Sequence, residues 1–458
     1  MLPWPTGAET KEPEETTVID DTRHLVWIAA TSWDGIPGTD RAMAKEMTRY
    51  ARVLWVDPPV SAVTTARRRG DIGGGILPSL SEPADGITRL TPVALPGLTR
   101  PGVRATTAPL LRTQVRWALR RLRIQPAVVV SGYLEDVLGR WDGAVNVAYI
   151  TDDHVAGAGL MRLSANRLRT QERQVAARAD VLAVVSPRLA EHWSALGADP
   201  VLVPNGCYPS GTGDVDPAPA AAGLPRPVAG LVGQLTERIN LRLLDAVAAA
   251  GISLLMVGPY DTRWEPQRFA TLIARPNVRY AGRVPADKVP SYLAAMDVGL
   301  TPYGDTPFNQ ASFPLKTLEY FSAGLPVVST DLPGSRWLRD DLARTDPAAV
   351  GQLLALASDE AGFVTAVRRL ATRPAAMATA AARQAGRPGA ARAKAGGAKS
   401  GRARAGSVKA ADGNAPRAAS ARAFAAHHTW ERRAEVLAAA AGLRAPQHSG
   451  HEEAQVRA

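Results

Sequence analysis

The sequence predicts an α/β fold built from two Rossmann-like, doubly wound parallel sheets, and three observations support this. Short apolar runs alternate with helical stretches along most of the chain, which is typical of parallel strands covered on both faces. A stretch at 207–226, rich in Pro, Gly and Ala, interrupts the alternation once, and the alternation then restarts. The chain has 458 residues, too many for one ordinary domain. We therefore expect two domains joined by a linker and facing a cleft.

The first domain, 23–206, is expected to hold strands at HLVWIAA, RVLWVDPP, ITRLTPVALP, PAVVVSGY, NVAYITD, ADVLAVVS and DPVLVPNG. A helical pattern, RAMAKEMTRYA, lies between the first two. The second domain, 227–373, repeats the scheme with strands at PVAGLVGQL, ISLLMVG, NVRYAGRV, DVGLTPY and PVVST. Helices are expected there at VPSYLAAM and PLKTLEYFSAG.

The positive charge of the chain is concentrated in one segment. The formal net charge is +11, from 54 Lys and Arg against 43 Asp and Glu. Between Arg373 and Arg422 there are eleven Lys and Arg residues and a single acid, so this segment supplies +10 of the total. Its Ala, Arg, Gly and Lys composition predicts a disordered tract at 374–420, before a terminal helix at 424–443 that packs back on the body. Tails at 1–22 and 444–458 complete the expected organisation.

The sequence also predicts where the protein works. Cys207 is the single cysteine, which excludes an intrachain disulfide and fits a reducing compartment. The N-terminal residues lack the pattern of a signal peptide, and no apolar run approaches the roughly 20 residues that span a bilayer. We therefore expect a cytoplasmic protein, in peripheral contact with the inner face of the membrane at most.

The chemistry is expected at the start of the helix PLKTLEYFSAG. Ser312, Phe313 and Leu315 lead into this helix, and Lys316 and Glu319 are three residues apart on one face near its first turn. A helix N-terminus offers backbone N–H groups and a positive dipole end, both suited to phosphate oxygens. Lys316 adds a point charge, and Glu319 can accept hydrogen bonds from ribose hydroxyls. An ordinary surface Lys–Glu pair is the alternative.

This segment resembles the donor-site signature of retaining glycosyltransferases with the GT-B fold, in particular family 4. In that family the second Glu of an E-x7-E pattern binds the ribose and a nearby Lys binds the diphosphate; Glu319 and Lys316 match these positions. The first Glu, which contacts the transferred sugar, falls on Ala311, and Asn309 or Gln310 could substitute. The departure suits the branch that resembles bacterial teichuronic-acid-biosynthesis-type transferases, with its PLK-x-x-EY-x-x-A-G-x-PVV motif.

A second match lies in GLVGQLTERINLRLL, which is similar to the family's strand, Gly loop and basic residue. Gly233 allows close backbone approach, and Arg238 is expected to reach the diphosphate, because its planar fork can bind two phosphate oxygens. An exposed Arg at a helix start is the alternative.

Two loops of the first domain are further candidates. In SWDGIPGTDR, Gly35 and Gly38 could let a substrate approach, although a plain turn explains them equally. After a buried strand, Asp152, Asp153 and His154 could orient the acceptor hydroxyl or contact the donor sugar, as the matching loop does in relatives. Metal binding through these three is conceivable, but relatives need no metal.

The segment LLRTQVRWALRRLRI predicts an amphipathic basic helix. Its four arginines on one face, opposite an apolar face, are compatible with docking on anionic lipid. A solvated face over the domain core is the alternative. The arginines are Arg112, Arg116, Arg120 and Arg123.

The resemblance implies an enzyme that moves a sugar from a nucleoside-diphosphate sugar to a hydroxyl acceptor with retention. It implies no cofactor and no metal, and a glycan or glycolipid acceptor in cell-envelope synthesis. Two alternatives stay open: a nucleotide-sugar 2-epimerase on the same scaffold, and a polyanion-binding or scaffolding protein recruited by the basic tract. That tract has no aromatic residue for stacking on bases, so we expect no specific nucleic acid.

Overall fold

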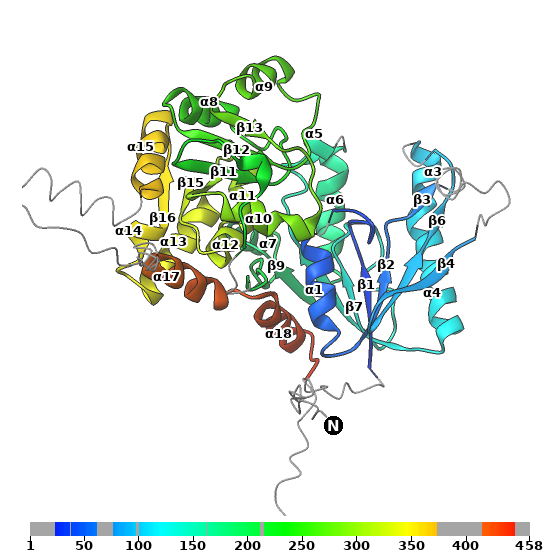
Figure 1. Cartoon of the computed structure of the whole chain (residues 1–458). Helices are drawn as coiled ribbons and strands as arrows, with labels where there is room; N and C mark the ends of the chain where they lie inside the picture. Colours follow the sequence, from blue (N-terminus) through cyan, green and yellow to red (C-terminus); the bar gives the residue numbers. More distant parts are fainter. Residues whose placement is uncertain are drawn as a thin grey trace, which may run out of the picture. The chain divides into compact units, whose positions relative to one another are not determined.

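The computed structural model describes residues 23–36, 38–61, 77–97, 100–161, 163–210, 215–372 and 415–444. They form two compact units (Figure 1). The first comprises the described residues up to Tyr149, 177–181 and those from Ala434 onwards; the second comprises 150–176 and 182–433. The predicted tail 1–22, most of the tail 444–458 and residues 374–414 of the predicted disordered tract lie outside the described residues.

In the first unit the strands run in the order β8-β7-β1-β2-β5-β4, and each neighbouring pair is parallel except β4 with β5. The edge strand β4 was not expected, because SLSEPA contains a proline and has no continuous apolar run. The elements of this part of the chain are β1 (His24–Ile28), α1 (Thr39–Met47), β2 (Arg52–Val56), β3 (Val60–Ser61), β4 (Ser79–Ala84), β5 (Ile87–Thr91), β6 (Val93–Ala94), α3 (Pro101–Ala105), α4 (Thr107–Leu122), β7 (Pro126–Ser131) and β8 (Val145–Ile150).

The second unit contains a six-stranded, fully parallel sheet in the order β13-β12-β11-β14-β15-β16. The chain winds outwards from β11 to β13 and then returns to the other side of β11 with β14. In such doubly wound sheets, ligands bind outside the carboxyl ends of the strands where the winding reverses. Here that point lies between β11 and β14. The prediction of an α/β fold with parallel sheets is confirmed.

Of the remaining elements, Val181 of β9 and the part of α18 from Ala434 onwards belong to the first unit, and the rest belong to the second. These elements include the short segments that precede this sheet and two helices near the end of the described chain. They are α5 (Ala158–Met161), α6 (Ala165–Ala176), β9 (Val181–Val184), α7 (Pro187–Ser194), β10 (Pro200–Leu202), η1 (Pro219–Ala221), β11 (Val228–Val232), α8 (Leu241–Ala249), β12 (Ser253–Val257), α9 (Pro266–Ile273), β13 (Val278–Tyr280), η2 (Ala286–Lys288), α10 (Val289–Ala294), β14 (Val298–Thr301), α11 (Pro307–Ala311), α12 (Leu315–Ser322), β15 (Val327–Thr330), α13 (Pro333–Thr345), α14 (Val350–Leu353), β16 (Leu354–Ala357), α15 (Glu360–Ala371), α17 (Ala415–Ala426) and α18 (Trp430–Ala440).

The last strand, β16, was missed by the sequence analysis. Its sequence LALA has no β-branched residue and follows a helix directly, so nothing local distinguishes it from a helix end. Its pairing with β15 over four residues is a tertiary contact that local sequence does not specify.

Helix α12 is held against the sheet by Tyr320. The Tyr320 hydroxyl accepts a hydrogen bond from the N–H of Val232 at 2.8 Å, at the end of β11. The Tyr320 ring lies so close to β14 that a Cβ at Gly299 would fall 2.4 Å from it, which no side chain could tolerate. Residue 299 must therefore be glycine for α12 to sit at this depth.

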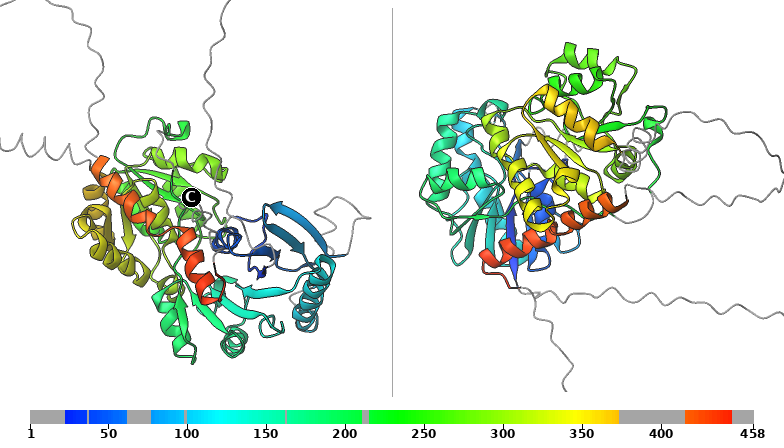
Figure 2. Two further views of the ribbon diagram at one scale, coloured as in Figure 1. Left: turned by 90° about the horizontal axis from the view of Figure 1, so that it is seen from below. Right: turned by 90° about the vertical axis from the view of Figure 1, so that its left-hand side faces the viewer.

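The end of the described chain differs from the expectation. Helix α17 begins at Ala415, so residues 415–420 are helical although their composition predicted disorder, and the single expected helix is two. Helix α17 packs on α12 (Figure 2), where Phe424 contacts the ring of Phe321 edge-on at 5.8 Å. The buried Arg417 donates to the carbonyl of Leu370 at 2.7 Å. Tertiary packing therefore stabilises a segment that has weak amphipathic character.

Cys207 forms hydrogen bonds with the connection between helices α17 and α18. The Cys207 N–H donates to the carbonyl of His428 at 2.8 Å, and the Trp430 N–H donates to the carbonyl of Cys207 at 3.2 Å. Burial raises the pKa of the Cys207 thiol to about 12, so it is a structural residue. No helix in the described ranges is both long and apolar enough to cross a membrane.

His428 makes the packing of the α17–α18 connection sensitive to pH. Its Nδ1 accepts a hydrogen bond from the guanidinium of Arg433, which can only donate, so the single ring proton lies on Nε2, 3.0 Å from a carboxylate oxygen of Asp341. Burial, together with the charge of Arg433, lowers the pKa of His428 from 6.5 to about 4.

We predict that His428 weakens the second unit in acid. Below pH 6.5 the unfolded chain takes up a proton that the folded protein refuses until about pH 4, so stability falls across this window as pH decreases. Urea midpoints of the wild type and the His428→Gln variant at pH 7.5 and pH 5 test this. The wild type should lose more stability between the two values than the variant. Parallel losses would contradict the prediction.

Candidate functional site

The residues expected to carry chemistry in the second domain converge on the point where the sheet's winding reverses. Arg238 lies in the loop that follows β11, and the segment with Ser312 and Lys316 follows β14 and opens α12. The two segments are in direct contact: Arg238 Nη2 donates to Ser312 Oγ at 3.1 Å. The site is therefore built at the place where the topology predicts a ligand crevice.

The guanidinium of Arg238 is clamped on its edge and over its face. Its Nε donates to Asn309 Oδ1 at 3.1 Å. Its Cζ lies 5.4 Å from the ring centroid of Tyr303 and 4.9 Å from that of Phe308. The aromatic contacts and the directed hydrogen bonds hold the group in one orientation. The alternative of an exposed Arg at a helix start does not fit this arrangement.

Asn309 is the centre of this arrangement. Its side chain is only 2% exposed, and its Nδ2 donates both to the carbonyl of Arg238 at 2.9 Å and to that of Gly304 at 2.8 Å. Its N–H is capped by Thr306, which starts α11. Because both ends of the amide are engaged, Asn309 does not suit the role of substitute for the missing first Glu. Gln310, whose Nε2 donates to Asp305 at 2.8 Å, is less buried.

Arg238 keeps donors for a ligand. Within the described part of the chain it forms no ion pair, and its hydrogen bonds to side chains use Nε and one N–H of Nη2. The N–H groups of Nη1 remain. A fixed guanidinium with free donors beside a strand-end loop is suited to an oxyanion such as phosphate.

Lys316 lies one turn away from this group, against the β11 loop. Its Cε would lie 3.7 Å from a Cβ at Gly233, and its Nζ donates to Glu319 Oε2 at 2.6 Å. Burial disfavours the charged form of Lys316, but the charge and hydrogen bond of Glu319 outweigh it, so the pKa of Lys316 is raised. The ammonium is therefore charged at neutral pH. Both side chains are about one-third exposed, 30% for Lys316 and 36% for Glu319, so a ligand can reach them.

Contacts of Ser312 and Phe313 fix the segment that leads into α12. No side chain caps the helix, whose N-cap is Pro314. Phe313 is buried and contacts Trp337 of α13 edge-on at 5.8 Å, and Ser312 Oγ donates to the carbonyl of Phe308 at 2.9 Å. Leu315, the first helical residue, is half-buried. An uncapped helix start beside two cations adds its positive dipole end to the same place.

The loop after β8 belongs to the second unit, and its Asp152 lies in the field of Arg238. Burial raises the pKa of Asp152 above its ordinary value, although the positive charge of Arg238 opposes this. Burial lowers the pKa of His154, and its Nδ1 is buried with no hydrogen-bond partner among the described residues. Asp153 differs, since its Oδ1 accepts the N–H of Ala156 at 2.8 Å and closes a turn. A neutral His with an unsatisfied nitrogen is suited to bind a hydroxyl.

The β1–α1 loop lies in the first unit and is considered by itself. Gly35 donates its N–H to the carbonyl of Ser32 at 2.9 Å, and a Cβ there would lie 3.0 Å from that oxygen. Gly38 precedes α1 in an extended conformation, with open space around a Cβ. Arg41 donates to the carbonyl of Trp33 at 2.6 Å and lies over its ring, so its own loop engages it. The role expected for Gly35 and Gly38 stays a prediction.

Three residues of the site were not recognised in the sequence. Tyr303 and Phe308 stack on Arg238, but they look like ordinary apolar residues of a strand end and a short helix. Gly258 follows β12, and a Cβ there would fall 1.8 Å from the carbonyl oxygen of Gly233. A Gly directly after a buried strand is the one sequence signal that could have suggested Gly258.

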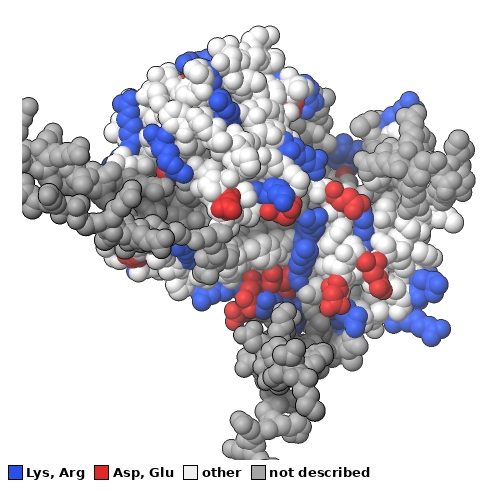
Figure 3. Space-filling view, viewed as in Figure 1, with Lys and Arg blue, Asp and Glu red and all other residues white. Residues whose placement is uncertain are grey.

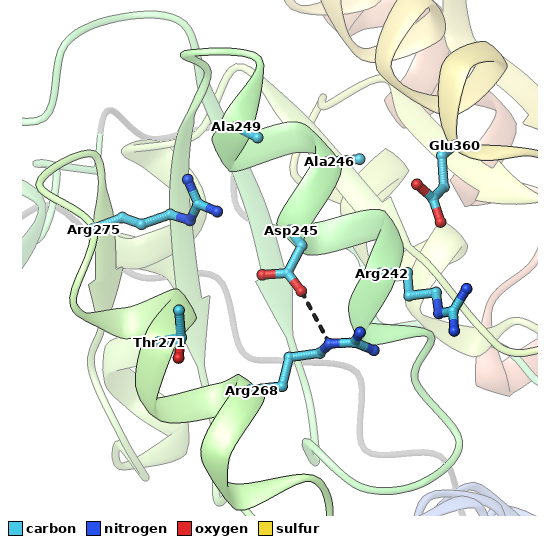
Figure 4. A pocket seen from close by; sticks show the side chains of 8 residues that line it. All are labelled: Arg242, Asp245, Ala246, Ala249, Arg268, Thr271, Arg275 and Glu360. Carbon is cyan, nitrogen blue, oxygen red and sulfur yellow. Dashed lines mark ion pairs between the residues drawn. The ribbon is translucent and has the colours of Figure 1, made fainter.

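Other parts of the described chain do not add to this site. No group of three or more His, Cys, Asp or Glu in the described ranges could hold a metal ion. A groove of about 660 Å³ lies elsewhere in the second unit, along α8 and α9, where Arg268 and Asp245 form an ion pair at 3.4 Å (Figure 4). None of the expected site residues lines it. Its lining residues are Arg242, Asp245, Ala246, Ala249, Arg268, Thr271, Arg275 and Glu360.

Comparison with known proteins finds similarities in the second unit and in the fold. Residues 226–373 match the family model described as glycosyl transferases group 1. The glycosyltransferase TuaH of Bacillus subtilis (strain 168), named for teichuronic acid biosynthesis, is 36% identical over 110 residues. That match covers 24% of this chain and 28% of TuaH, so the chain aligns with less than a third of its relative.

Solved structures resemble the chain over most of its length. Sucrose-phosphate synthase from Thermosynechococcus elongatus superposes with a TM-score of 0.61 at 14% identity, over 91% of this chain and 98% of its own. HepE from Anabaena, in complex with UDP and glucose, gives 0.55 at 14% identity, over 90% and 98%. A trehalose-6-phosphate protein from E. coli, bound with UDP-2-fluoro glucose, gives 0.59 at 10% identity, over 91% and 98%. At such low identity these likenesses show the fold alone, which is that of GT-B proteins.

We predict that Asn309 determines the stability of the second unit. Replacing it with Leu should lower the free energy of unfolding by roughly 1–3 kcal/mol, because the carbonyls of Arg238 and Gly304 lose their donor. Urea unfolding of Asn309→Leu measures the loss. Gln310→Ala is the matched control, since the neighbouring amide bonds only to Asp305. Equal stability of the two variants would contradict the prediction.

Proposed function

We propose that this chain is a glycosyltransferase that moves a sugar from a nucleoside-diphosphate sugar to a hydroxyl acceptor, with retention of anomeric configuration. The match of residues 226–373 to glycosyl transferases group 1 supports the enzyme class. The observation that carries the proposal is the placement of two cations, Arg238 and Lys316, on the loops where the winding of the sheet reverses between β11 and β14.

The proposed chemistry is electrostatic. As the bond between the sugar's anomeric carbon and the diphosphate breaks, negative charge develops on the departing phosphate oxygen. Arg238, Lys316 and the start of α12 bring positive charge to that place before the reaction begins, which lowers the barrier without reorganisation. The acceptor oxygen forms the new bond to the anomeric carbon, and its proton passes to the departing phosphate oxygen.

The nucleotide half of the donor would bind along the strand-end loops. Glu319 keeps a carboxylate oxygen, besides the one bonded to Lys316, that can accept from ribose hydroxyls. The backbone approach at Gly233 and Gly258 leaves no side chain in this place. A uridine diphosphate donor is the first candidate, because HepE and the E. coli protein are named with UDP ligands.

The sugar half of the site is proposed for His154 and Asp152. The partnerless Nδ1 of His154 can bond a sugar or acceptor hydroxyl, and Asp152 lies in the field of Arg238. Ala311 offers no carboxylate, and its carbonyl already accepts from the hydroxyl of Ser186. Gln310 is the polar side chain beside Ala311 that could recognise the sugar together with His154 and Asp152.

The acceptor is proposed to be a cell-envelope glycan or glycolipid. The support is the similarity to TuaH, which is named for teichuronic acid biosynthesis. Thermal unfolding in the presence of UDP-, GDP- and TDP-sugars tests the donor. The proposal expects an upward shift with one of these classes, by mass action on the folded state. No shift with any of them would contradict it.

We predict that Arg238→Ala and Lys316→Ala each lower turnover by roughly 10²–10³, as does losing one preorganised donor to a developing oxyanion. Initial rates at saturating donor give the measurement. Arg242→Ala and Lys288→Ala are matched controls, because these exposed cations belong to the same unit but not to the site. Turnover by Lys316→Ala at the wild-type rate would show that the diphosphate binds elsewhere.

Product analysis separates the proposal from its nearest alternative. A new glycosidic bond is expected when donor and acceptor extracts are supplied together. A free nucleotide sugar with one inverted hydroxyl would instead indicate a 2-epimerase and would refute the transfer proposal.

Deletion of residues 374–414 tests the binding-protein alternative. The deletion should end at 414 because α17 begins at Ala415 and packs on α12. A transferase should keep its turnover without the tract, since no site residue lies within it. Turnover that depends on the tract would favour a function based on polyanion binding.

A further inference from the structure

We propose that the outer face of α4 docks on an anionic lipid surface. We call this surface the α4 basic face and define it by Trp117, Arg120, Arg121 and Arg123. It belongs to the first unit, and the inference is independent of the proposed transfer reaction.

The orientation of α4 is fixed by its inner side. Leu111, Val115 and Ala118 are buried, and α4 packs on α3 and β6. Gln114, also buried, pairs with the backbone of Val93 through two hydrogen bonds, one to the N–H at 2.8 Å and one to the carbonyl at 2.7 Å. The apolar side of the helix is therefore already used, and what faces outwards is a separate surface.

That surface is basic and carries an exposed indole. Trp117 is 39% exposed, which is unusual for a residue of this size on a folded domain. Arg120 and Arg121 follow it by three and four residues, so they flank it on the helix surface. Figure 3 shows Lys and Arg side chains gathered on the surface over α4, at the lower right.

Among the described residues, no acidic side chain forms an ion pair with the arginines of the α4 basic face. Helix α4 contains no Asp or Glu. Throughout the described residues, none forms an ion pair with Arg120, Arg121 or Arg123. The two other arginines of the expected stripe differ: Arg112 pairs with Asp136 at 2.8 Å, and Arg116 lies over Trp141. Of the four arginines expected on one face, Arg112 and Arg116 are therefore engaged by other residues, whereas Arg120 and Arg123 form no ion pair within the described residues.

The backbone at the end of α4 points to a role for Arg123. This residue adopts φ 57° and ψ 40°, the left-handed conformation that glycine takes at helix ends without strain. An arginine there is strained and exposed, and its side chain forms no ion pair within the described residues. The charge is therefore placed beside Arg120 and Arg121 at a structural cost.

Anionic lipid is the partner that matches both kinds of side chain. Indole rings favour the boundary between headgroups and acyl chains, and guanidinium groups bind lipid phosphates. Each arginine near an anionic leaflet contributes about fivefold in partitioning, that is about 1 kcal/mol. Three arginines and one Trp would give weak, reversible and salt-sensitive binding, as expected for a peripheral contact.

Sedimentation of the full chain with vesicles tests the proposal. Vesicles of equal parts phosphatidylglycerol and phosphatidylcholine should bind the protein at low salt, and vesicles of phosphatidylcholine alone should not. The double variant Arg120→Glu and Arg121→Glu should lower partitioning by at least roughly 20-fold, because two attractive charges become repulsive. Trp117→Ala should lower it by a smaller factor.

The matched control reverses two arginines on another helix. Arg169→Glu and Arg173→Glu on α6 make the same change in net charge, again on two exposed arginines of one helix. This control should keep most of the binding. Equal losses in both double variants would overturn the proposal, since binding would then follow net charge or the basic tract. Unchanged thermal unfolding midpoints show that the variants fold. Dimerisation through the α4 basic face without binding to vesicles would also overturn the proposal.

Discussion

The buried amide of Asn309 is the interaction on which the candidate site depends. It joins the two turns of chain that leave the sheet on either side of its point of reversal, one after β11 and one after β14. By bonding to the backbone and to Nε of Arg238, it fixes both the path of the loop and the orientation of the guanidinium. Ser312 and the start of α12 are then held in contact with the same group. A buried amide can satisfy both partners only in this geometry, so the site is preorganised by a requirement of folding.

The charge of the site follows from the same arrangement. Arg238 is held by neutral partners, Asn309 and Ser312, so its charge remains available within the part of the chain that the structure describes. Lys316 has a carboxylate partner, but one that is accessible and shared with solvent. At Ala311, the position of a carboxylate in the family that the sequence resembles, a backbone carbonyl bonds to Ser186 instead. The local balance therefore favours binding of an anion.

Much of the fold and part of the site were predictable from the sequence. The buried strands are continuous apolar runs rich in β-branched residues, which is why β1, β2, β11, β12 and β14 were found. β4 lacks such a run, and the short run of β16 has no β-branched residue. Lys316 and Glu319 could be paired because helical spacing is a local property. The partnership of Asn309 with Arg238 could not, because 71 residues separate them and neither sequence context signals the other. The same holds for the rings of Tyr303 and Phe308.

By itself the sequence determined the class of fold, the concentration of basic charge in one tract and the likeness to glycosyltransferases at Ser312–Thr330. These depend on composition, periodicity and local spacing, which short segments carry. Only the tertiary structure decided that Asp152 lies in the field of Arg238 and that residues 415–420 are helical. It also decided that Arg112 and Arg116 are engaged, whereas Arg120 and Arg123 form no ion pair among the described residues. Each of these depends on which distant surfaces pack together, and the free energy of that packing belongs to the whole fold rather than to any one segment.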